Sequence, residues 1–98
     1  MKDKFKYHLD SVLREYGITE QELFARTKRR ISVDARQALF LLCRKDDLPI
    51  SYIQQYFKNN GLEVSHSTII HGTRRMRMLL AEDETMKEFF DEQLGVGS

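Results

Sequence analysis

Residues 49–81 read PISYIQQYFKNNGLEVSHSTIIHGTRRMRMLLA, and this stretch predicts two helices joined by a turn. Pro49 favours a helix start, since its missing N–H costs nothing in a first helical turn. The Asn-Asn-Gly run at 59–61 is a turn signal, and Ser65 can cap a second helix over about 66–81. The inner faces of the two helices are Ile50, Ile53 and Phe57 on the first and Ile69, Thr73, Met76 and Leu80 on the second.

The second of these helices opens with four small or polar side chains: Ser65, His66, Ser67 and Thr68. A helix-turn-helix places its second helix in the major groove of DNA, where the first residues meet base edges. Hydroxyl and imidazole groups can donate or accept hydrogen bonds there, and a Thr methyl can touch a thymine methyl. The alternative is structural: Ser65 only caps the helix, and Ser67 and Thr68 are solvated first-turn residues.

The remaining sequence predicts further helices and no strand. The expected helices are about 5–16, closed by Gly17; a short one opened by a Thr19–Glu22 capping box; 33–45, capped by Ser32; and an acidic one over about 85–94. The helix at 33–45 is apolar almost all round, so we expect it at the centre of the core, with Cys43 packed there. We predict a single all-α domain over 1–98, built from six helices and ordered over about 5–94.

Composition excludes several classes of protein. Ninety-eight residues make one domain, and 41% hydrophobic with 32% charged residues suits neither a disordered chain nor a membrane protein. The longest apolar run, 38–43, is far too short to span a bilayer, and the first ten residues lack the apolar core of a secretion signal. We therefore expect a soluble, cytoplasmic protein. A single cysteine excludes an internal disulfide framework.

The sequence offers no enzyme or metal site. His66 and His71 are five apart, whereas two zinc ligands on one helix face lie four apart. Serine and histidine adjoin at 65–67, but neighbours on one helical turn do not form a catalytic triad. We expect no enzyme, no cofactor and no bound metal.

Charge is divided unevenly along the chain. Residues 26–77 carry eleven Lys/Arg against four Asp/Glu, a net charge of +7, whereas residues 78–98 carry one against six, a net charge of −5. Four cations, Arg26, Lys28, Arg29 and Arg30, gather at 26–30, which we place on a loop. A basic middle between acidic flanks indicates a polyanionic partner for one face. The alternative is an ordinary solvated loop. The acidic last helix offers either a solvated face or a surface for a protein partner.

Two motifs resemble a known family. Residues 29–38, RRISVDARQA, are similar to the basic loop and Arg-Gln helix start of the C-terminal DNA-binding domain of DnaA, the bacterial replication initiator. Residues 65–72, SHSTIIHG, are similar to that family's Asp-His-Thr-Thr-Val-Leu-His-Ala signature. The resemblance extends over about 7–94 and implies a six-helix, Trp-repressor-like helix-turn-helix domain that binds duplex DNA.

The resemblance also implies roles for individual residues. Base reading in the major groove falls to Ser65, His66, Ser67 and Thr68. Contacts to the minor groove or to phosphate fall to Arg26, Lys28, Arg29 and Arg30, among which the sequence does not choose. Further phosphate contacts fall to Arg36, Gln37, Ile50, Ser51, His71 and Arg75. The partner implied is a duplex carrying a DnaA-box-like site, bound by a monomer, with no membrane contact.

Three departures from the family bear on function. Ser65 replaces the signature Asp, the turn between 57 and 66 is longer than usual, and no G-x-x-x-x-G-K-[ST] loop for ATP occurs in these 98 residues. The resemblance therefore implies a DnaA-like module without an ATPase part, acting in replication initiation or its regulation. Its biological setting stays open between an accessory initiator of a phage or mobile element and a regulator that blocks the host initiator or a promoter. The alternative function is a protein-interaction domain or transcriptional regulator that kept the fold without DnaA-box recognition.

Overall fold

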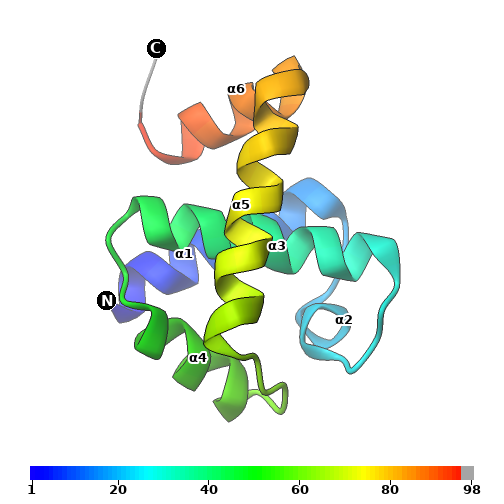
Figure 1. Ribbon diagram of the computed structural model, residues 1–98, viewed down its shortest axis with the longest axis vertical. Helices are drawn as coiled ribbons and strands as arrows, with labels where there is room; N and C mark the ends of the chain where they lie inside the picture. The colour runs from blue at the N-terminus through cyan, green and yellow to red at the C-terminus, as the bar shows by residue number, and fades with distance from the viewer. Residues whose placement is uncertain (96–98) are drawn as a thin grey trace.

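The computed structural model describes residues 1–95, which form six helices and no strand (Figure 1). The helices are α1 (Lys2–Tyr16), α2 (Glu20–Phe24), α3 (Arg30–Lys45), α4 (Ile50–Asn59), α5 (His66–Glu82) and α6 (Glu84–Gln93). The all-α, six-helix prediction is confirmed. None of these helices is both long enough and apolar enough to cross a membrane within the described residues.

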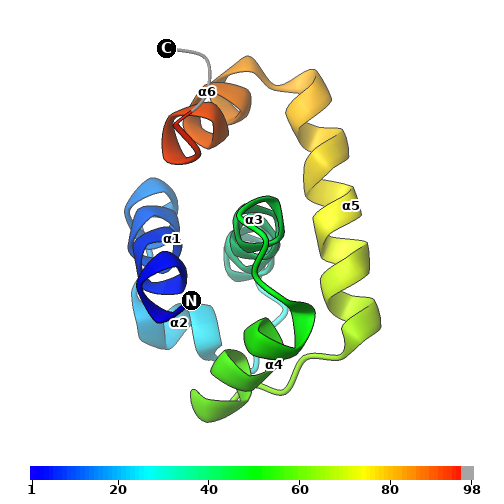
Figure 2. The same cartoon turned by 90° about the vertical axis from the view of Figure 1, so that its left-hand side faces the viewer.

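Helix α3 lies at the centre of the fold, as its apolar sequence predicts. Figure 2 looks nearly along α3 and shows it between α1 and α5. Its buried apolar residues are Ala35, Ala38, Leu39, Phe40, Leu41, Leu42 and Cys43. Helices α1, α4 and α5 turn their apolar faces toward it, and burial of such side chains contributes roughly 1.5–3 kcal/mol each. Helix α5 thus packs directly on this buried central helix.

Three predicted helix ends are confirmed. Gly17 closes α1 in the left-handed conformation with φ 63°. Thr19 and Glu22 form both hydrogen bonds of a capping box at the start of α2. The Ser65 hydroxyl caps α5 by accepting from the Thr68 amide, at 3.0 Å. These signals are local, because each needs only residues within a few positions of one another.

The start of α3 corrects the sequence prediction. Ser32 does not cap this helix, which begins at Arg30 with Arg29 at the cap position and no side-chain cap. Ser32 lies inside the first turn and is 1% exposed, so its side chain packs inward. The Val33 amide donates to the Arg29 carbonyl at 3.0 Å. Arg30 therefore belongs to a helix, and only the rest of the basic run is irregular.

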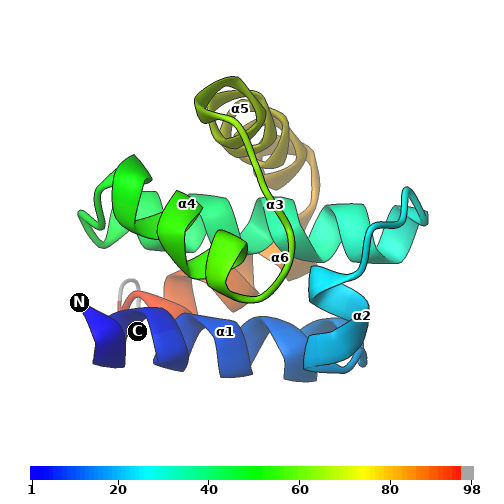
Figure 3. The ribbon, with the colours of Figure 1, turned by 90° about the horizontal axis from the view of Figure 1, so that it is seen from below.

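Helices α4 and α5 are joined by an ordered turn (Figure 3). Gly61 takes φ 89°, which glycine adopts without strain. The Leu62 amide donates to the Phe57 carbonyl at 3.0 Å, and the Gln54 side chain donates to the Val64 carbonyl at 3.1 Å. These two hydrogen bonds fold the turn back onto α4, next to the start of α5.

Gly72 lets α5 lie close to α3. A Cβ atom added there would stand 2.9 Å from Cγ of Gln37 and 2.9 Å from Cδ2 of Phe40. Phe40 is 1% exposed and packs against the Phe57 ring, with centroids 5.3 Å apart, so it has little room to move.

We expect Gly72→Ala to destabilise the protein. Alanine gains about 1 kcal/mol of helix propensity over glycine, whereas overpacking a filled core costs typically about 1–3 kcal/mol. The net loss of unfolding free energy should be on the order of 1 kcal/mol, measured by urea unfolding. An unfolding free energy above that of wild type would contradict this prediction, because it would show that α3 and α5 accommodate the added methyl group without loss of packing energy.

His8 ties α1 to the end of α3. Its Nε2 lies 2.9 Å from Oδ2 of Asp46, and Nζ of Lys4 lies 3.5 Å from Oδ1. The hydrogen bond with His8, followed by the charge of Lys4, lowers the pKa of the Asp46 carboxyl.

Because this pKa is lower in the folded chain, Asp46 stabilises the protein at pH above its unfolded value of about 3.9 and stops doing so as pH falls through the folded value. We expect Asp46→Asn to be less stable than wild type at pH 6, with the difference shrinking below about pH 4. Urea unfolding across this range measures it. A difference that is the same at pH 6 and pH 3 would contradict the pairing.

Candidate nucleic-acid interface

The first turn of α5 is exposed to solvent. Ser65, His66, Ser67 and Thr68 all lie on the surface. The hydroxyl oxygens of Ser65 and Thr68 are 2.9 Å apart and share a hydrogen bond, in addition to the capping bond. His66 and Ser67 make no side-chain hydrogen bond to any residue in the described part of the chain. The turn therefore presents one imidazole and one hydroxyl that are free to meet a ligand.

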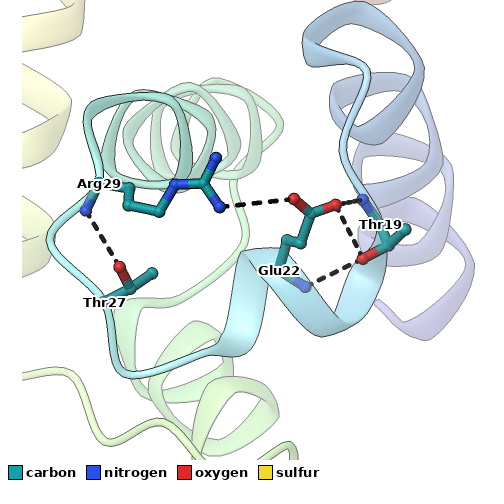
Figure 4. A network of polar contacts seen from close by, with 4 residues as sticks. All are labelled: Thr19, Glu22, Thr27 and Arg29. Atoms are coloured by element: carbon teal, nitrogen blue, oxygen red, sulfur yellow. Dashed lines mark hydrogen bonds and ion pairs between the residues drawn. The ribbon is translucent and has the colours of Figure 1, made fainter.

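The basic segment, residues 26–30, leads directly into α3. It is held in a defined shape: the Thr27 amide donates to the Ala25 carbonyl at 2.9 Å, and the Arg29 amide donates to the Thr27 hydroxyl at 3.2 Å. Figure 4 shows the Arg29 guanidinium turned toward Glu22, 3.9 Å away. Hydrogen bonds from the backbone N–H and hydroxyl of Thr19 lower the pKa of the Glu22 carboxyl.

The Arg36 side chain binds the backbone at the start of the basic segment. Its guanidinium donates to three backbone carbonyls: Leu23 at 2.6 Å, Thr27 at 3.0 Å and Ala25. All three of its nitrogens are engaged inside the chain. The resemblance implies that Arg36 contacts phosphate. In the structure, its guanidinium instead bonds to the backbone of residues 23–27. The sequence does not predict these hydrogen bonds, because no local pattern pairs Arg36 with carbonyls nine to thirteen residues earlier.

We expect Arg36→Ala to loosen the segment and to cost about 2–3 kcal/mol of unfolding free energy, because hydrogen bonds to a charged group are worth about 1.5–3 kcal/mol and the carbonyls lose their partner. The Thr27 and Arg29 amides should also exchange faster with solvent. Denaturant unfolding and hydrogen exchange measure the two effects. Unchanged stability together with weakened DNA binding would identify Arg36 as a phosphate contact.

A shallow hollow brings the basic segment and α5 together. It is lined by Lys28 of the basic segment, by Arg30, Val33 and Gln37 of α3, and by Arg75 of α5. Arg30 and Lys28 make no ion pair with any carboxylate in residues 1–95. Arg26 is exposed and Arg29 turns toward α2. The sequence gives no reason to choose among the four cations as DNA contacts. In the structure, Lys28 and Arg30 are the two that face α5.

Arg75 is partly neutralised within this hollow. Its Nη1 lies 2.7 Å from Oδ1 of Asp34 and also donates to Oε1 of Gln37. The Gln37 oxygen is thereby occupied, so its NH₂ group is the part available to an outside acceptor. Asp34 and Arg75 are 41 residues apart in sequence, and no pattern in the sequence indicates that they pair.

The other predicted phosphate contacts lie on two elements. Ile50 is half-buried and Ser51 exposed at the start of α4, where Pro49 supplies no side-chain cap. His71 is exposed on α5, one turn beyond Ser67. The basic segment, the first turn of α5 and the start of α4 thus offer donors from three separate parts of the chain.

Comparison with known proteins adds no family to this description. No protein-family model matches the chain, and no solved structure gives a significant match.

Proposed function

We propose that this chain is a sequence-specific, double-stranded DNA-binding module of the DnaA-like helix-turn-helix type. The observation that carries the proposal is that α5 has an exposed polar first turn and, about two turns farther along, places Arg75 in a hollow shared with Lys28 and Arg30. His66 and Ser67 reach base edges in the major groove. Cations of the basic segment contact phosphate or the adjoining minor groove and fix the register.

The module has no catalytic step in this proposal. It acts by occupying sites in replication initiation or in its regulation, in the cytoplasm, as a monomer. The resemblance of residues 29–38 and 65–72 to the DnaA signature supports the choice of partner. Ser65 in place of Asp indicates a target other than the standard DnaA box, because a serine hydroxyl engaged in capping α5 replaces a carboxylate that can accept from a cytosine amino group.

Three internal contacts favour a second function, that of a protein-interaction domain. Two of the nominated cations, Arg75 and Arg29, already face carboxylates, and the Ser65 and Thr68 hydroxyls already bond to each other. Polar groups that already bond to one another within the domain are less available to bind a polyanion. The acidic helix α6 then supplies an alternative surface for a protein partner.

Titration of a random-sequence duplex at several salt concentrations separates the two functions. If about five or six phosphates are neutralised, the logarithm of the binding constant should fall with the logarithm of salt at a slope near −5. The protein-interaction alternative predicts no binding at moderate salt and elution of the protein in the flow-through of a duplex column.

A further inference from the structure

We propose that a second hollow, on the opposite flank of α5, binds a phosphate group. It has a volume of about 250 Å³ and lies between the C-terminal end of α3 and the middle of α5. Its walls are Arg44 and Lys45 of α3 with Ile70, Thr73, Arg74 and Arg77 of α5. Neither the interface described above nor the resemblance uses Thr73, Arg74 or Arg77.

The two hollows lie on different sides of α5 because of helical geometry. Each residue of an α-helix turns by about 100°, so positions 70, 73, 74 and 77 fall on one flank and positions 71 and 75 on the other. Between these flanks, Ile69, Gly72 and Met76 are buried against the core. The first hollow meets the N-terminal half of α3, and the second meets its C-terminal end.

Charge selects an anion for the second hollow. Four of its six lining residues are cationic and none is acidic. Within residues 1–95, none of these four cations forms an ion pair with a carboxylate. Nη1 of Arg44 donates to the Leu48 carbonyl at 2.8 Å, which fixes the side chain and leaves its other nitrogens for a ligand. Arginine guanidinium groups match phosphate oxygens in a bidentate geometry.

An unsatisfied hydroxyl marks the same place. Thr73 is 8% exposed, lines the hollow, and its Oγ1 has no hydrogen-bond partner. A buried hydroxyl without a partner costs free energy, and native proteins rarely tolerate one without a reason. The Oγ1 atom is itself buried, so rotation of the Thr73 side chain toward the hollow would bring the hydroxyl to a phosphate oxygen seated among the cations. The hydroxyl and the four cations together define a site for phosphate rather than a diffuse basic surface.

The phosphate can come from two sources. A helix lying in the major groove has a sugar-phosphate backbone on each side, so the two hollows could contact the two strands of one duplex. This source depends on the proposed DNA binding. A small phosphorylated molecule is the other source and does not.

The test begins with inorganic phosphate and the full chain. Amide chemical shifts are followed during titration at constant ionic strength, with chloride as the reference anion. Saturable shifts at Thr73 and Arg74 are expected. Thr73→Val, which removes the hydroxyl at nearly constant volume, should weaken phosphate binding by about tenfold, since a hydrogen bond to a charged group is lost. Its thermal stability should equal or exceed that of wild type, because the removed hydroxyl has no partner to lose.

The second arm uses a random-sequence duplex and the variant Arg74→Gln/Arg77→Gln. The matched control is Lys2→Gln/Arg14→Gln, which removes the same charge from exposed positions on α1. With saturable phosphate shifts in hand, a salt slope less steep than that of the control by about 2 assigns the hollow to duplex phosphate. A slope equal to that of the control assigns it to a small phosphorylated ligand. Absence of saturable shifts at Thr73 overturns the proposal, whatever the duplex result.

Discussion

Replacing Lys28 and Arg30 together by alanine is expected to weaken binding to every duplex, specific or random. Both side chains line the hollow next to Arg75 and are free of carboxylate partners within the described residues. Each lost phosphate contact reduces the salt slope by about 0.9, so the slope of the double variant should be less steep than that of wild type by about 2. Fluorescence anisotropy of a labelled duplex between low and moderate salt measures this change.

Arg29→Ala is the comparison for that experiment, with the change in slope taken per positive charge removed. Its guanidinium faces Glu22 rather than α5, so its removal should change the salt slope by much less than the double substitution (Figure 4). All the substituted side chains are exposed, so thermal unfolding should be similar in each protein. If the Lys28/Arg30 variant has the same salt slope as wild type, the basic segment does not contact DNA phosphate.

His66→Ala is expected to abolish much of the discrimination between a cognate and a random duplex. The imidazole projects from the exposed first turn of α5 and has no partner within the described chain, so its truncation leaves the fold intact. A base contact is worth about 1–3 kcal/mol, which is roughly 5- to 150-fold in affinity on the cognate site. Binding to random DNA should change little. Competition titrations with the two duplexes give both numbers.

Ser65→Ala is the control that distinguishes loss of base recognition from loss of the helix cap of α5. Loss of an N-cap hydroxyl costs typically about 1 kcal/mol of stability, so this variant should unfold more easily. His66→Ala should not. Equal losses on cognate and random DNA for His66→Ala would assign His66 to phosphate contact instead of base reading.

Local signals in the sequence predict most of the fold. Gly17, the Thr19–Glu22 box and Ser65 each act through hydrogen bonds within a few residues, and the structure confirms all three. The apolar run at 38–43 also places α3 correctly at the centre. The start of α3 is where this reasoning fails. Ser32 has the chemistry of a cap, but burial of its side chain within the first turn decides its position, and burial is a tertiary effect.

Long-range contacts account for what the sequence does not reveal about the candidate interface. Arg36 and Arg75 look like two free cations in the sequence. In the structure, one supports the basic segment through backbone carbonyls and the other pairs with Asp34. The unpartnered hydroxyl of Thr73 is equally invisible, since threonine at an inner helical position ordinarily packs or bonds to its own backbone. Each of these depends on how α5 crosses α3.

Selection of bound sequences from a random duplex library tests the central claim most directly, because it needs no assumed target. The wild-type chain should enrich a short motif, and His66→Ala should lose preference at one or two positions of that motif while the remainder persists. No enrichment over the input library by the wild-type chain would contradict sequence-specific recognition by the first turn of α5.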